Sequence, residues 1–116
     1  MSIPDVSNPA LSILILQCRD LDDPMADHEI DCIKKKFQNT ATQVKVHNVV
    51  GSAPTQDLLD TDALIIGGSG AYSVHAQECQ HWVEPTCNFI EQALKQNLPG
   101  VGICFGHQLL GKVLGS

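Results

Sequence analysis

Residues Leu11–Cys18 read LSILILQC, a nearly continuous apolar run that predicts a β-strand. A run that is apolar at consecutive positions is typical of parallel sheets, because helices cover both faces of such sheets. The next segment, Ala26–Phe37, repeats apolar residues at helical spacing, as at Ile30 and Ile33. The first third of the chain therefore predicts a strand and a crossover helix, the beginning of an α/β fold.

The rest of the chain continues this alternation of short apolar runs and helical stripes. Strands are predicted at Gln43–Val50, Ala63–Ile66 and Val101–Cys104, and helices at residues 83–94 and Gly106–Leu114. Pro85 is expected in the first turn of its helix, where a missing N–H is tolerated. Strands that alternate with helices form parallel sheets, so we predict an α/β, three-layer sandwich with a mainly parallel, flavodoxin-like sheet.

The two ends of the chain frame this predicted domain. Residues 1–10 contain two prolines and no basic residue, and we expect them to form a tail before a domain at residues 11–116. The sequence stops two residues after the last predicted helix, so the domain looks truncated at its C-terminus. We expect an open sheet that ends there to expose one of its edges or faces.

Composition excludes several classes of protein. The chain has 116 residues, enough for one core, and 13 acidic against 7 basic residues give a net charge of −6. This charge and the low aromatic content, 4%, argue against a nucleic-acid partner. The sequence shows neither a signal peptide nor an apolar stretch long enough to cross a bilayer, so we expect a cytoplasmic protein without a membrane partner. The 5 cysteines lack CxxC spacing, which argues against a disulfide framework and against zinc, and no cofactor is expected.

Cys104 lies in the most informative segment, where Gly102 and Gly106 flank it at a distance of two residues. Small residues at these positions allow a sharp turn from strand to helix, which exposes a nucleophile at the carboxyl edge of the sheet. The N-terminus of the following helix favours the thiolate over the thiol. The alternative interpretation is a buried cysteine in a tight turn between a strand and a helix.

A glycine cluster follows another predicted strand, where Ile65–Gly70 reads IIGGSG. Backbone N–H groups left free after a strand can stabilise a developing oxyanion. An ordinary turn or a phosphate loop is the alternative, although neither the dinucleotide fingerprint nor a Walker loop matches.

Together these segments resemble class I glutamine amidotransferase domains. GICFGHQLLG (Gly102–Gly111) is similar to the nucleophile motif of that family, and IIGGSGAYSV (Ile65–Val74) is similar to its oxyanion loop. The resemblance is strongest to the branch related to the amidotransferase part of GMP synthase, and it runs from about Leu11 to the C-terminus. It implies that glutamine is the substrate and that a synthetase or other ammonia-accepting partner uses the product.

The resemblance also implies roles for five residues. Cys104 would be the nucleophile that forms a γ-glutamyl thioester and releases ammonia. The backbone amides of Gly68 and Phe105 would form the oxyanion hole. Gln108 and the backbone of Gly70 would help to hold the substrate glutamine.

One departure from the family pattern leaves enzymatic activity open. The family completes its triad with a His and a Glu on a later segment, which this sequence does not contain. The chain therefore resembles the N-terminal half of such a domain. None of its 5 histidines is marked as a substitute base, although His75 and His81 follow the glycine cluster.

Two other functions remain alternatives to a glutaminase domain. A γ-glutamyl hydrolase or peptidase on the same scaffold shares the cysteine turn but attacks a γ-glutamyl amide in a peptide or conjugate. A non-catalytic flavodoxin-like interaction module would use Cys104 only as an oxidisable thiol.

Overall fold

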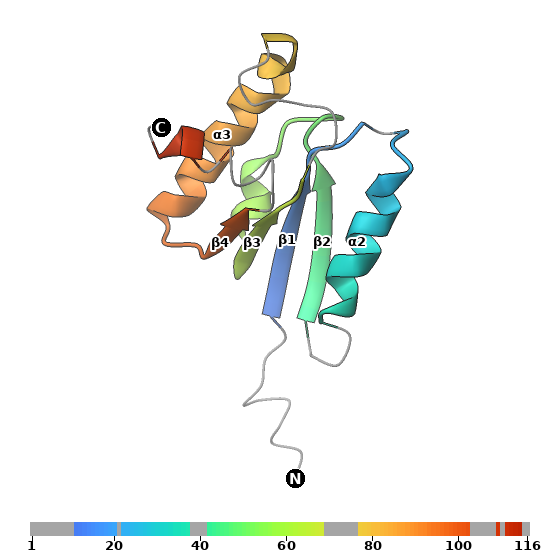
Figure 1. The fold of residues 1–116 in the computed structure, drawn as a ribbon. Coiled ribbons are helices and arrows are strands. Elements are labelled where there is room, and N and C mark those ends of the chain that lie inside the picture. The colour runs from blue at the N-terminus through green and yellow to red at the C-terminus, as the bar shows by residue number, and fades with distance from the viewer. Residues whose placement is uncertain are drawn as a thin grey trace.

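A four-stranded sheet organises the chain, for which the computed structural model describes residues 11–20, 22–37, 42–68, 77–102, 109 and 111–114. All neighbouring strands are parallel and their order is β2-β1-β3-β4 (Figure 1). The strands are β1 (Leu11–Gln17), β2 (Thr42–Asn48), β3 (Ala63–Ile66) and β4 (Gly100–Gly102). The helices are α2 (Met25–Lys35) and α3 (Gln80–Lys95), with 3-10 turns η1 (Gln56–Leu59) and η2 (Gln77–Cys79). The predicted parallel α/β fold is confirmed.

The direction of the crossovers explains how the two helices are placed. The chain passes from β1 outward to β2 in one direction, returns to the other side of β1 for β3, and continues to β4. Since right-handed crossovers in opposite directions place their helices on opposite faces, α2 and α3 flank the sheet as separate layers (Figure 1). The switch point lies between β1 and β3, at whose carboxyl ends such folds bind ligands.

The main hydrophobic core lies between the sheet and α3. Alternate side chains of β1 and β3 point toward this helix, while the intervening Ile13 and Ile15 are buried on the opposite face. Because both faces of β1 are covered, its apolar residues run continuously rather than alternating. The core consists of Leu14, Leu16, Cys18, Val49, Leu64, Ile66, Cys79, Trp82, Val83, Phe89, Ile90, Ala93 and Leu109. Within the described ranges, no helix has the length and apolar character needed to cross a membrane.

Pro85 corrects one expectation from the sequence. Helix α3 begins at Gln80, so Pro85 lies in the second turn of the helix and not in the first. Its ring nitrogen cannot donate to the carbonyl of His81, an exposed residue whose carbonyl water can solvate. The helix continues across this missing hydrogen bond because its buried face packs in the core.

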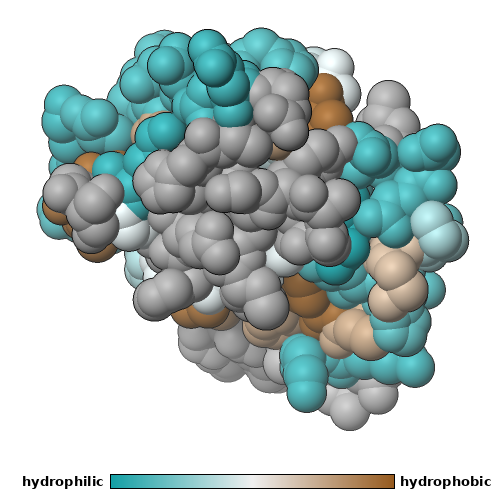
Figure 2. Space-filling view, turned by 45° about the horizontal axis from the view of Figure 1, so that its top comes forward, coloured by the Kyte–Doolittle hydropathy of each residue, from teal (hydrophilic) through white to brown (hydrophobic). Residues whose placement is uncertain are grey.

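An apolar surface lies beside β4, which is an edge strand of the described sheet. Val101 is 59% exposed there, as expected for an uncovered edge. Hydrophobic residues also gather in the lower middle of the face shown in Figure 2. A groove that runs across β1, β3 and β4 is lined by Ile13, Phe37, Ala63, Leu64, Ile65, Pro99, Gly100 and Val101.

Replacing Val101 with lysine should reduce self-association of the chain. A charge on an edge strand opposes pairing with a second copy, and an exposed substitution should change the free energy of unfolding by only about 0.5 kcal/mol. Sedimentation velocity measures the self-association, and thermal unfolding measures the stability. Val83→Lys, in the core, should instead unfold the chain, because Val83 is 0% exposed. A folded Val101→Lys chain that associates as strongly as the unchanged chain would contradict this expectation.

Candidate functional site

Gly68 is the one predicted site residue that lies within the described part of the chain. It is buried and lies two residues after the end of β3, at the carboxyl edge of the sheet. The other four predicted site residues lie outside the described residues: Gly70, Cys104, Phe105 and Gln108. Their predicted positions remain predictions.

The pairing of β3 with β4 relates the two predicted site segments to each other. The register pairs Ile66 with Gly102, the last residue of β4. Gly68 follows the first of these by two residues, and Cys104 follows the second by two. The glycine segment and the cysteine segment therefore begin at the same edge of the sheet, from neighbouring strands.

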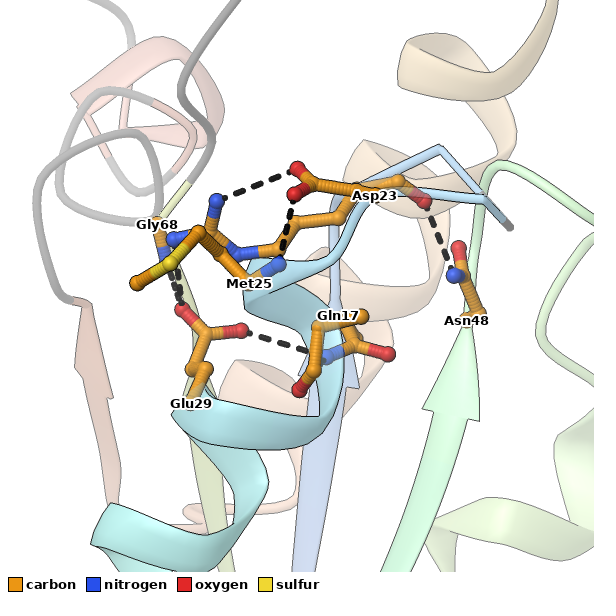
Figure 3. A network of polar contacts seen from close by, with 8 residues as sticks. Gln17, Asp23, Met25, Glu29, Asn48 and Gly68 are labelled. Carbon is orange, nitrogen blue, oxygen red and sulfur yellow. Dashed lines mark hydrogen bonds and ion pairs between the residues drawn. The ribbon is translucent and has the colours of Figure 1, made fainter.

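A polar network links this edge to α2 (Figure 3). Its centre is Glu29, whose side chain is 12% exposed. The backbone N–H of Gly68 donates to Glu29 Oε2 at 3.0 Å, and Gln17 Nε2 donates to Glu29 Oε1 at 3.4 Å. Arg19 Nη2 lies 3.4 Å from Glu29 Oε2. One carboxylate thus joins the ends of β1 and β3 at the switch point.

Arg19 supplies the positive charge of the network. Its Nη1 lies 3.3 Å from Asp23 Oδ2, and its carbonyl accepts a hydrogen bond from Asn48 Nδ2 at 2.8 Å. Burial alone lowers the pKa of Arg19, but hydrogen bonds and charge interactions with Glu29 and Asp23 raise it above its ordinary value. Arg19 Nε is buried and has no hydrogen-bond partner among the described residues. The guanidinium therefore stays charged between two carboxylates.

Gln17 and Gly67 show why the sequence fits this arrangement. Gln17 is only 4% exposed, and its Nε2 also donates to the carbonyl of Ala26 at 2.8 Å, which fastens the start of α2 to β1. A Cβ atom on Gly67 would lie 2.8 Å from Glu29 Oε1, closer than real Cβ contacts. Glycine at this position therefore lets the carboxylate approach the backbone.

The two described amides of the glycine segment, those of Gly67 and Gly68, both donate hydrogen bonds, whereas the sequence predicted free amides. Gly67 N–H donates to the carbonyl of Leu16 at 2.9 Å, which extends the pairing with β1, and Gly68 N–H donates to Glu29. Glu29 could not be predicted from the sequence because its partners lie far away along the chain. The only local signal was Gln17, a buried polar residue that ends an apolar strand.

The described cysteines differ in how easily they ionise. Burial raises the pKa of Cys18 to about 12, and burial also raises the pKa of Cys87. Cys79 is buried. Cys32 is exposed, with its Sγ 3.5 Å from His28 Nε2. Because Cys32 is exposed, it is the described cysteine that labelling experiments must control for.

The described histidines do not lie in the polar network. His28 and His81 are exposed on α2 and α3, and His47 Nε2 lies 2.9 Å from the carbonyl oxygen of Ser52. His75 and His107 lie outside the described residues. Within the ranges that the structure covers, no three His, Cys, Asp or Glu side chains are grouped to hold a metal ion.

Known proteins match the chain at the level of sequence. The family model for class-I glutamine amidotransferases matches residues 26–116. The glutamine-hydrolyzing GMP synthase subunit from Sulfurisphaera tokodaii is 42% identical over 62 residues, 53% of this chain and 30% of that protein. Imidazole glycerol phosphate synthase subunit HisH from Streptococcus gordonii is 36% identical over 77 residues, 62% of this chain and 36% of that protein. The chain matches about a third of each relative's length.

A solved structure matches the chain at the level of fold. The crystal structure of a glutamine amidotransferase from Thermotoga maritima superposes with a TM-score of 0.70. The match covers 90% of this chain and 43% of that one, at 22% sequence identity. The two chains therefore share the same fold over the matched part.

Proposed function

Because the chain belongs to the class-I glutamine amidotransferase family, we propose that it carries the nucleophile half of a site that releases ammonia from glutamine. The observation that carries this proposal is the register of β3 and β4, which starts the glycine segment and the cysteine segment at one edge of the sheet. A nucleophile and an oxyanion donor must lie this close to act on one carbonyl group. Residues 11–116 are proposed to form part of the amidotransferase domain.

The proposed reaction begins with the Cys104 thiolate attacking the side-chain amide carbon of glutamine. A sulfur–carbon bond forms, and the carbonyl oxygen becomes an oxyanion that accepts hydrogen bonds from the backbone N–H groups of Gly68 and Phe105. The amide nitrogen of the intermediate takes up a proton and leaves as ammonia, and a γ-glutamyl thioester remains on Cys104. Water then releases glutamate and restores the thiol. For Gly68, this role requires that its hydrogen bond to Glu29 break as the oxyanion forms.

The ammonia is proposed to pass to a separate synthase subunit. The two curated relatives are themselves named as subunits of synthases, GMP synthase and imidazole glycerol phosphate synthase. The described surface includes an apolar groove across β1, β3 and β4, in addition to its hydrophilic residues. The cytoplasm is the proposed compartment, since a reactive thiol persists in a reducing environment.

A glutamine analogue with a diazomethyl ketone in place of the amide tests the proposal on the chain itself. The thiol adds to the diazo carbon, nitrogen gas leaves, and the thiol proton moves to that carbon, which yields a stable thioether. We expect saturable labelling of Cys104 by mass spectrometry, and protection by glutamine. Cys32→Ser controls for the exposed thiol. Labelling that neither saturates nor responds to glutamine would overturn the proposal.

Gln108→Ala should weaken glutamine binding without changing the nucleophile. Loss of one hydrogen bond to the substrate should cost roughly 1–3 kcal/mol, and this raises the glutamine concentration needed for half protection. The rate of Cys104 labelling by iodoacetamide, a reagent that needs no glutamine pocket, should stay within about twofold of the unchanged chain. Equal protection in the two proteins would remove Gln108 from the binding site.

A further inference from the structure

We propose that Glu29 is a positioning residue that holds the Gly68 amide away from the oxyanion until glutamine binds, an inference that rests on the proposed function. The carboxylate acts through Gly68 and does not touch the substrate. Glu29 comes from α2 on one side of the switch point, whereas Gly68 lies two residues after the end of β3 on the other side. The contact therefore links a helix to the position of a predicted donor.

The geometry shows that the donor is occupied. A backbone amide has a single proton to donate. The amide of Gly68 donates it in a hydrogen bond to Glu29 Oε2, with a nitrogen–oxygen distance of 3.0 Å. Hydrogen bonds to a carboxylate are roughly twice as strong as bonds between neutral groups. An oxyanion that needs this amide must compete with Glu29 for it.

The charges of the network make sharing the amide unfavourable. The network holds two carboxylates, Glu29 and Asp23, against the single guanidinium of Arg19. An oxyanion on the Gly68 amide would add a further negative charge beside Glu29, where burial weakens solvent screening. The bond to Glu29 must therefore break when the oxyanion forms.

The same network can keep the released carboxylate in place. Gln17 Nε2 and Arg19 Nη2 both lie 3.4 Å from Glu29 oxygens and remain as partners. Release of Gly68 then costs one hydrogen bond and does not leave Glu29 as an isolated buried charge.

Substitution of Glu29 tests this inference through a gain in rate. In the analogue the ketone oxygen stands where the glutamine amide oxygen would lie, and it takes up part of the negative charge as the sulfur attacks the adjacent diazo carbon. The rate of this reaction therefore depends on the Gly68 donor. Glu29→Ala should raise the maximal labelling rate about tenfold, because the competing acceptor is gone. Glu29→Gln keeps a neutral acceptor, so it should raise the rate by about threefold. The half-saturating analogue concentration should stay within about twofold.

Two controls separate this role from a structural one. Asp31→Ala removes a carboxylate from an exposed position of the same helix and should leave the rate unchanged. Labelling by iodoacetamide reports general thiol reactivity and should also stay unchanged. A merely structural Glu29 would lower the melting temperature and would not raise the analogue rate.

The outcomes distinguish this inference from the proposed function. Rates that rise in the order unchanged chain, Glu29→Gln, Glu29→Ala support it. Equal or lower rates in folded variants overturn it, and Glu29→Gln alone decides if Glu29→Ala does not fold. If the unchanged chain shows no saturable labelling, the proposed function fails, and the inference fails with it.

Discussion

Incubated with glutamine, the 116-residue chain should release ammonia no faster than background, although its Cys104 thiol stays reactive. The predicted turn into a helix N-terminus would favour the thiolate, but the proposed reaction also needs a base that takes the thiol proton and returns it to ammonia. Loss of one triad member commonly costs roughly four or more orders of magnitude in turnover. Ammonia release and iodoacetamide labelling of Cys104 measure the two halves of this expectation.

Efficient ammonia release by this chain would contradict that expectation. If the release disappeared in Cys104→Ser and also in His75→Ala or His81→Ala, that histidine would be the base. Cys32→Ser is the matched control, because Cys32 is the exposed cysteine among those described, and its loss should not affect ammonia release.

Gly68→Val should lower kcat by roughly 10²–10³ in a longer polypeptide that also carries the family's His and Glu segment. The added side chain crowds the buried segment after β3 and moves the amide from its place. The value of KM should change less than kcat, because the oxyanion exists only after the attack. Steady-state ammonia release measures both constants.

Gly100→Ala is a suitable control for this loss. Its Cβ would meet its nearest atoms, the carbonyl oxygen and Cβ of Leu64, at 3.7 and 3.9 Å, which is ordinary van der Waals contact. Its kcat should stay within about twofold of the parent. A Gly68→Val protein with the kcat of this control would remove Gly68 from the oxyanion hole.

Local sequence patterns predicted the fold because its main determinants are local. In each element, the local pattern of apolar residues indicates which side chains are buried. Examples are the run that begins at Leu11, the helical stripe near Ile33 and the short run at Ala63–Ile66. Their alternation specifies parallel strands with crossover helices. Within the described residues, the predicted order of strands and helices therefore agrees with the structure, while the predicted helix Gly106–Leu114 lies partly outside them.

The polar part of the site could not be predicted in the same way. Glu29 reaches Gly68 across 39 positions of sequence, and it reaches Gln17 across 12. Only the folded sheet brings these residues together at the switch point. Pro85 was misplaced for a similar reason, since core packing carries α3 through a proline that local propensity disfavours.

The most direct test is a crystal structure of the chain with the diazomethyl ketone analogue attached to Cys104. We predict that the ketone oxygen accepts hydrogen bonds from the backbone N–H groups of Gly68 and Phe105, with nitrogen–oxygen distances of about 2.7–3.1 Å. Glu29 should then have lost its hydrogen bond to Gly68 and kept its ion pair with Arg19. A ketone oxygen directed away from the glycine segment, with the Gly68 N–H still hydrogen-bonded to Glu29, would contradict the proposed oxyanion hole.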